Sequence, residues 1–218
     1  MALAKLKSKT RTDYTVDEYL EMERAAVERH EFIDGEIYQM AGESDAHGII
    51  SANLSGEIYT QLKGKDCQMR IKDAKIKSGG FAQMLGKSTK GMFSYPDLVV
   101  VCGEVIYHDK KKDVILNPKV IIEVLSGSTE VFDRNDKFIR YSMFNDTLTD
   151  YVLVSQEVPQ IEHFIRQDDN SWKQYVFIGL DKVCRVESIE CNLDLKEIYD
   201  RIKFSKKTLD FLKEIENI

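Results

Sequence analysis

The sequence contains few prolines, which mark linkers between domains, and few cysteines, which form disulfides and metal sites. Its 218 residues include only three prolines and four cysteines. With so little proline there is no Pro-rich linker, and the length suits one domain at 14–218 that follows a flexible basic tail at 1–13. The cysteines form no C-x-x-C pair, so neither a zinc site nor a disulfide framework is expected. We expect reduced thiols that fill the core of a cytoplasmic protein. These thiols are Cys67, Cys102, Cys184 and Cys191.

Long apolar runs and an excess of positive charge are also missing. No run approaches the roughly 18 apolar residues of a membrane span, and the basic first residues lack the apolar core of a secretory signal. Lys and Arg number 31 against 37 Asp and Glu, a net charge of −6. This balance argues against nucleic-acid binding by bulk charge, although a local basic patch remains compatible with it. A hydrophobic content of 43% indicates a globular protein rather than a disordered one.

Local signals predict the first elements of secondary structure. Thr15 and Glu18 have the spacing of a capping box, which predicts a helix over 16–29. The dipeptide Asp34-Gly35 lies between two strand-like runs and predicts a hairpin. From 45 to 62 the apolar residues recur in steps of four, so an amphipathic helix is expected to end before Gly64.

The remaining elements alternate between strands and helices. The runs at 95–102 and 118–126 are almost continuously apolar, as expected for strands covered on both faces. Helices interleaved with hairpins predict an α/β fold with a central mixed β-sheet flanked by helices. The other predicted elements are a strand over 67–78, a loop over 78–91, a helix over 129–145, four strands between 150 and 190, and a helix over 206–218.

Two carboxylates interrupt the apolar strands. Asp97 precedes Leu98-Val99-Val100-Val101, and Glu123 lies between two pairs of branched apolar residues. A charge inside such a strand costs several kcal/mol unless a partner offsets it. Each carboxylate has a structural explanation, either an ion pair or a strand end in water. Two acidic groups in consecutive core strands instead favour a shared cation, and oxygen ligands suit Mg²⁺.

Weaker candidates surround this pair. Asp133, Lys137 and Tyr141 recur at i, i+4 and i+8 on the helix after Glu123. They fit either an exposed ion pair beside a tyrosine or a lysine aimed at the two carboxylates to stabilise charge on a phosphate. Three further candidates also have structural explanations. Asp73 fits an exposed strand end, His47 fits a hydrogen-bonded core histidine, and Glu31 fits a strand edge kept soluble by charge.

Positive charge is concentrated in one segment of this acidic chain. Between 63 and 77, six basic residues stand against two acidic ones, a surplus of 6 − 2 = +4. Such a run is usually a solvated face, but next to a two-carboxylate metal site it could also follow a phosphate backbone. The six nucleic-acid-binding candidates are Lys63, Lys65, Arg70, Lys72, Lys75 and Lys77.

Taken in order, these motifs resemble those of the Uma-type family of putative restriction endonucleases, a bacterial domain-of-unknown-function family. The resemblance covers roughly residues 14–200 and is carried by HEFIDGEIYQMAG, AHG, YPDLVVVC, IIEVLSGST, the D-x-x-x-K-x-x-x-Y of Asp133, Lys137 and Tyr141, and DYVLVSQ. The family is placed in the PD-(D/E)-x-K nuclease superfamily, which implies a restriction-endonuclease-like fold.

The resemblance also implies roles for single residues. It makes Asp97 the aspartate of the PD motif and Glu123 the acidic residue of the second motif. Leu125 occupies the position of the superfamily lysine, so Lys137 on the next helix is the candidate replacement. The implied enzyme is a Mg²⁺-dependent endonuclease that hydrolyses DNA, with Mn²⁺ as a substitute metal. The backbone carbonyl of Val124 would be a further metal ligand.

Two alternatives from other functional classes remain open on the sequence. Leu125 at the lysine position favours a nucleic-acid-binding module that has lost catalysis, and the net charge of −6 favours an interaction protein. A homodimer is expected under the nuclease hypothesis, because cutting both strands of DNA often takes two active sites and two-fold dimers are the commonest oligomers.

Overall fold

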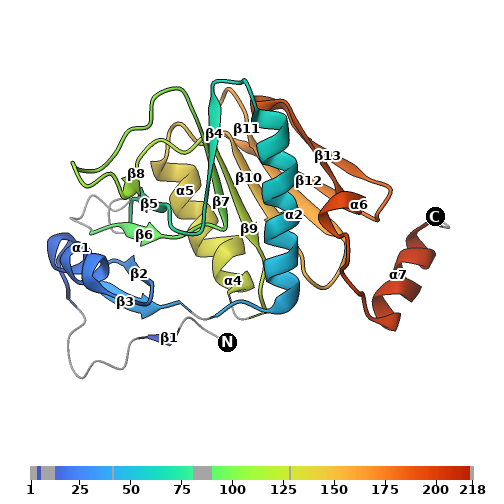
Figure 1. Ribbon diagram of the computed structural model, residues 1–218, viewed down its shortest axis with the longest axis horizontal. Coiled ribbons are helices and arrows are strands. Elements are labelled where there is room, and N and C mark those ends of the chain that lie inside the picture. Colours follow the sequence, from blue (N-terminus) through green and yellow to red (C-terminus); the bar gives the residue numbers. More distant parts are fainter. Residues whose placement is uncertain (1–3, 6–12, 41, 81–89, 128, 217–218) are drawn as a thin grey trace.

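The computed structural model describes residues 4–5, 13–40, 42–80, 90–127 and 129–216 (Figure 1). Of the predicted basic tail it describes Asp13 and the pair Ala4 and Lys5, which form strand β1 and pair with β3. Most of the loop predicted for 78–91 lies outside the described residues. No helix in the described part of the chain is long and apolar enough to cross a lipid bilayer.

Among the described residues, the strands form two six-stranded sheets and a separate two-stranded sheet. The N-terminal sheet has the order β1-β3-β2-β6-β5-β8, and the central sheet has the order β12-β11-β10-β9-β7-β4. In the central sheet β9 and β10 are parallel while the other neighbours are antiparallel, so the predicted mixed sheet is confirmed. The N-terminal strands are β1 Ala4–Lys5, β2 His30–Ile33, β3 Glu36–Gln39, β5 Lys75–Ser78, β6 Met92–Ser94 and β8 Val114–Ile115. The central strands are β4 Cys67–Ile71, β7 Leu98–Cys102, β9 Val120–Val124, β10 Asp150–Val154, β11 Gln160–Arg166 and β12 Trp172–Ile178.

Helices cover both faces of the central sheet. Helix α2, Asp45–Leu62, lies on one face and buries Ile50 and Leu54 completely against it (Figure 1). On the other face a helical segment separates the central sheet from the N-terminal sheet. This segment consists of α4 Glu130–Phe132, the π-helix η1 Asp133–Lys137 and α5 Phe138–Phe144.

The outer layers complete the apolar core. Helix α1, Val16–Ala25, packs Tyr19 on the outer face of the N-terminal sheet. A hairpin of β13 Val183–Val186 and β14 Cys191–Asp194 packs beside α2 and shares its core cluster with the central sheet. The remaining elements are η2 Glu187–Ile189, α6 Leu195–Ile198 and α7 Lys206–Glu216, the last of which stands beside the body of the fold in Figure 1.

The local sequence signals predicted the first helix, the hairpin and the second helix correctly, except that the first helix ends earlier than expected. The capping box of Thr15 and Glu18 is confirmed, but α1 ends at Ala25 rather than 29 because Ala26 adopts an extended conformation. The hairpin turn is confirmed as well, with positive φ at both Asp34 and Gly35, as a type I′ turn requires. The helix predicted for 45–62 has those bounds.

The single strand predicted for 67–78 is wrong. Residues 67–71 form β4 in the central sheet, and residues 75–78 form β5 in the N-terminal sheet. The chain changes sheet at Lys72, whose φ of +50° breaks the extended backbone. Apolar and polar residues alternate on both sides of the break because both segments are strands, so the sequence pattern did not reveal it.

The expectation that all four cysteines are reduced is also wrong. Cys67 on β4 and Cys102 on β7 are direct partners in the strand register and form a disulfide. Cys184 and Cys191 are free and buried, as expected. The sequence did not indicate the pairing because the two cysteines are 35 positions apart and become neighbours only when β4 pairs with β7.

We predict that reduction of the Cys67–Cys102 disulfide lowers the free energy of unfolding by about 3–4 kcal/mol, since the bond closes a loop of 35 positions. Urea denaturation with and without dithiothreitol measures the difference. The variant Cys184→Ser should show the same dependence on dithiothreitol, because Cys184 is free. Alkylation of all four cysteines in unreduced, denatured protein would contradict the disulfide.

Candidate active site

A buried lysine holds the two sheets together at the site. The Nζ atom of Lys137 lies 3.2 Å from Glu31 Oε1, 3.2 Å from Glu123 Oε1 and 3.1 Å from Asp133 Oδ1. None of the four side chains is more than 6% exposed. The hypothesis of an exposed ion pair between Asp133 and Lys137 is therefore wrong, since burial makes their ion pair part of a four-residue cluster.

Three elements position the four residues of this Lys137 cluster, which are Glu31, Glu123, Asp133 and Lys137. Glu31 and Phe32 alternate on β2, so that Phe32 faces α1 and Glu31 faces the helical segment. Glu123 points to the same segment from β9, on the face where Ile121 contributes to the core. Asp133 and Lys137 are the first and last residues of η1, and π-turns inside α-helices often occur at functional sites.

The charges in the cluster compete for one cation. Burial raises the pKa of Glu123 above its ordinary value; Lys137 opposes this effect, and Asp133 raises the pKa further. Burial also raises the pKa of Glu31, again against the effect of Lys137. Burial alone would lower the pKa of Lys137, but the three carboxylates outweigh it and raise that pKa, so the ammonium stays charged.

Asp97 reaches the same place from the neighbouring strand. It directly precedes β7, where Leu98 pairs with Ile122, so the next register position places Asp97 opposite Glu123. The Oδ2 atom of Asp97 accepts a hydrogen bond of 2.7 Å from the Val124 N–H. The negative charge of Asp97 also contributes to the raised pKa of Glu123. The structure thus brings together the two carboxylates that interrupt the apolar strands.

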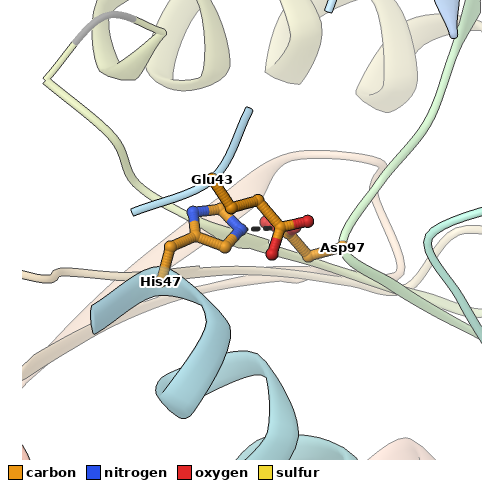
Figure 2. Close-up of side chains that lie close together, drawn as sticks. All are labelled: Glu43, His47 and Asp97. Carbon is orange, nitrogen blue, oxygen red and sulfur yellow. Dashed lines mark hydrogen bonds and ion pairs between the residues drawn. The ribbon is translucent and has the colours of Figure 1, made fainter. Parts of the chain in front are cut away.

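A second group of side chains meets Asp97 from α2. His47 Nε2 lies 2.7 Å from Asp97 Oδ1, and Glu43 lies just before the helix, beside both residues (Figure 2). Glu43, His47 and Asp97 each offer a ligand atom within 4.8 Å of the others, close enough to share a metal ion. Ser44 caps α2 by accepting a hydrogen bond from the His47 N–H, which fixes the histidine in the first turn.

Two further candidates from the sequence, Tyr141 and Asp73, lie in different surroundings. Tyr141 is fully buried, its hydroxyl lies 2.7 Å from Ser94 Oγ, and burial together with the charge of Glu123 raises its pKa well above the ordinary value. Asp73 has an 82% exposed side chain and pairs with Arg29 at 2.9 Å. It is a surface residue that contacts none of the cluster.

The six basic candidates do not form one patch. Lys63 and Lys65 follow α2, and Lys65 donates to the carbonyls of Ile189 and Glu190. Arg70 lies on β4 and hydrogen-bonds Gln68.

The other three basic candidates are on the N-terminal sheet or at its boundary. Lys75 is buried beside Asp113, and Lys77 lies 3.4 Å from His108. Lys72 is the member that the structure brings to the site, since it pairs with Glu43.

Sequence reasoning missed Glu43 and Gln156. Glu43 directly precedes Ser44, the N-cap of α2, and its closeness to His47 is the sequence signal that could have found it. Gln156 follows β10, and its side chain contacts His47 and the carbonyl of Leu125. Gln156 is the last residue of the DYVLVSQ motif, but the sequence does not indicate its contact with His47, because the two residues are far apart along the chain.

We predict that Lys137→Met destabilises the protein by about 3–5 kcal/mol, because it leaves three buried carboxylates without a cation. Urea denaturation at pH 8 measures the loss. Adding Glu31→Gln should recover part of it by removing one of the repelling charges. The control Lys182→Met, at a 51% exposed side chain, should change stability by less than about 0.5 kcal/mol. A Lys137→Met protein as stable as the wild type would contradict the cluster's role.

We predict that Glu123→Gln stabilises the protein in the presence of a chelator, and increasingly so at higher pH. The pKa of Glu123 is raised above 4.5 by folding, so its contribution to stability is complete below pH 4.5 and is lost as pH rises toward the folded-state value. Glutamine does not titrate and avoids this loss. Denaturation between pH 4 and 8 measures the difference, and a variant that is less stable at pH 8 would identify Glu123 as the essential partner in a structural ion pair.

Comparison with known proteins shows which family this chain belongs to. An uncharacterized protein of Synechocystis sp., slr1290, is 34% identical over 189 residues, which are 86% of this chain and 92% of that protein. A second one, sll1609, is 32% identical and covers 72% of this chain and 84% of its own length.

A solved structure has the same fold. It is the crystal structure of "a putative nuclease belonging to DUF820" from Anabaena variabilis, with a TM-score of 0.68 at 17% identity, and the alignment covers 87% of this chain and 99% of that one. This confirms the predicted restriction-endonuclease-like fold. The family model "Uma2: Putative restriction endonuclease" matches residues 16–196. The chain therefore belongs to the Uma2 family of putative restriction endonucleases.

Proposed function

We propose that this protein is a Mg²⁺-dependent endonuclease that hydrolyses phosphodiester bonds of DNA. One observation carries the proposal: Asp97 directly precedes β7 where that strand pairs with β9, beside Glu123, and a lysine contacts Glu123. Family membership supports nuclease chemistry, while the metal and the nucleic acid are inferred from the residues themselves.

The residues at the site suit a hard divalent cation. Mg²⁺ prefers oxygen ligands, and the carboxylates of Asp97 and Glu123 provide them. The carboxylates around Lys137 bring three negative charges against one positive charge, and Asp97 adds another. A divalent cation between Asp97 and Glu123 offsets this surplus. The backbone carbonyl of Val124 is the proposed further ligand.

Bound Mg²⁺ would polarise the scissile phosphate and lower the pKa of a water molecule for in-line attack. Asp97 and Glu123 would hold the metal. Lys137 opposes the rise that burial causes in the pKa of Glu123, and it would add positive charge where negative charge develops on the phosphate. Asp133 and Glu31 hold the lysine in place, and Tyr141 packs behind it.

The DNA substrate is proposed from local charge and not from the net charge. Lys72 approaches the site through Glu43, and the exposed Lys63 lies at the other end of α2, away from His47. Lysines of this kind contact phosphates without reading sequence. Lys75 is excluded from this role because it is buried beside Asp113.

A binding module without catalysis is the second candidate function. Leu125 is only 4% exposed and packs in the core, so the position of the superfamily lysine supplies no charge. If Lys137 does not replace that lysine in the reaction, the fold and the metal site would still bind nucleic acid.

We predict that the protein nicks or linearises supercoiled plasmid with Mg²⁺, and that Asp97→Asn reduces the rate by at least about a hundredfold, roughly 3 kcal/mol of transition-state stabilisation. Gel electrophoresis of plasmid time courses measures the rate. The matched control is Asp136→Asn, the same change at an exposed position of η1, which should cleave like the wild type.

The same experiment separates the two functions. Plasmid retention by wild-type protein in a gel-shift assay, without cleavage in Mg²⁺ or Mn²⁺, would support the binding module. Equal rates for wild type and Asp97→Asn would remove Asp97 from the mechanism and overturn the proposed metal site.

A further inference from the structure

We infer that Gln156 sets the tautomer of His47, so that His47 donates its Nε2 proton to Asp97 and acts as a positioning residue for this carboxylate rather than as a metal ligand. The role of Asp97 rests on the proposed function, whereas the tautomer itself does not. The inference follows from three contacts at the entrance of α2.

The first contact fixes the orientation of the Gln156 amide. Its Nε2 atom lies 2.8 Å from the backbone carbonyl oxygen of Leu125, which can only accept a hydrogen bond. At the other end of the amide, the Ser44 hydroxyl donates to Gln156 Oε1 at 2.6 Å. The opposite orientation would place two oxygens against each other at Leu125, so the NH₂ group faces Leu125.

The second contact fixes the proton on His47. The same NH₂ group lies 3.3 Å from His47 Nδ1. An amide nitrogen donates and does not accept, so Nδ1 must be the unprotonated, accepting nitrogen of the ring. A neutral imidazole carries one proton, which is therefore on Nε2.

The third contact shows where that proton is used. His47 Nε2 lies 2.7 Å from Asp97 Oδ1, while the Val124 N–H donates to Asp97 Oδ2 at 2.7 Å. The two donors hold both oxygens of the carboxylate and so define its plane. Each oxygen keeps a further lone pair for a metal.

Under this inference, Glu43, His47 and Asp97 do not bind one metal ion together, although they lie close enough to do so. Their ligand atoms are close enough for one ion. A metal on Nε2 would have to displace the proton that binds Asp97, because Nδ1 already accepts from Gln156. In most metal-bound histidines the other ring nitrogen donates its proton to an acceptor, and here it faces a donor.

Nuclear magnetic resonance tests the tautomer directly. Two-bond ¹H–¹⁵N correlation spectra of the metal-free protein distinguish the two ring nitrogens, and the spectrum of His47→Gln assigns the His47 signals. We expect an Nε2-protonated ring in the wild type, and the same pattern after saturation with MgCl₂. Loss of the Nε2 proton on adding MgCl₂ would make His47 a ligand and overturn the inference.

A pair of glutamine variants tests the cause. Gln156→Glu replaces the donor with an acceptor and should move a proton to His47 Nδ1. Gln167→Glu is the matched control, because Gln167 also donates to a backbone carbonyl, that of Ile165 at 3.0 Å, and contacts no histidine. An unchanged His47 ring in Gln156→Glu would show that Gln156 does not set the tautomer.

Two histidine variants test the role in cleavage. A glutamine side chain can still donate an N–H to Asp97, so His47→Gln should keep the Mg²⁺ concentration for half-maximal cleavage within about threefold. His47→Ala loses the donor and should need roughly 10–100 times more Mg²⁺, the usual cost of losing a partner behind a metal ligand. Equal losses in both variants would contradict positioning. A wild type without cleavage would overturn the proposed function and leave the spectroscopic result intact.

Discussion

The arrangement of this molecule depends on one buried ammonium group. Lys137 contacts Glu31 from the N-terminal sheet, Glu123 from the central sheet and Asp133 from its own turn. A buried carboxylate is tolerated when a cation offsets its charge, and removal of that cation leaves the full cost of burial. The two sheets therefore share an electrostatic contact in addition to the apolar core around α5.

The geometry of η1 makes this shared contact possible. Asp133 and Lys137 lie at the two ends of a π-turn, and both side chains are directed inward. On the opposite side of the central sheet, the first turn of α2 brings His47 to Asp97. The two elements approach the same end of β7 and β9 from opposite faces. The proposed metal position is thus enclosed by elements that also form the core.

Local patterns predicted those parts of the fold that depend on neighbours in sequence. The capping box at Thr15, the Asp34-Gly35 turn and the bounds of α2 needed only short-range information. The juxtaposition of Asp97 and Glu123 was also predictable, because charges in consecutive core strands are costly unless they meet a common partner.

Contacts between distant segments were less accessible from the sequence. The Cys67–Cys102 disulfide, the third carboxylate on Lys137 and the contact between Gln156 and His47 all depend on register or on packing between layers. Glu31 had an adequate local explanation as a strand-edge residue. Its burial became evident only when the N-terminal sheet was placed against η1.

The leucine at position 125 and the lysine at position 137 have a common structural explanation. Leu125 continues the face of β9 that carries Glu123 and packs in the core with Tyr141. A lysine at position 125 would place a charge in this core. Lys137 on η1 instead reaches Glu123 from the helical segment that covers the sheet and leaves the core apolar.

This arrangement also makes Lys137 a stabilising residue, because its ammonium serves three carboxylates and not one. Lys137 is therefore required for folding as well as for the proposed chemistry, so its removal would change both at once. Asp97 lies outside the Lys137 contacts and is held by His47 and Val124. For this reason Asp97, and not the lysine, is the residue at which chemistry and stability can be separated.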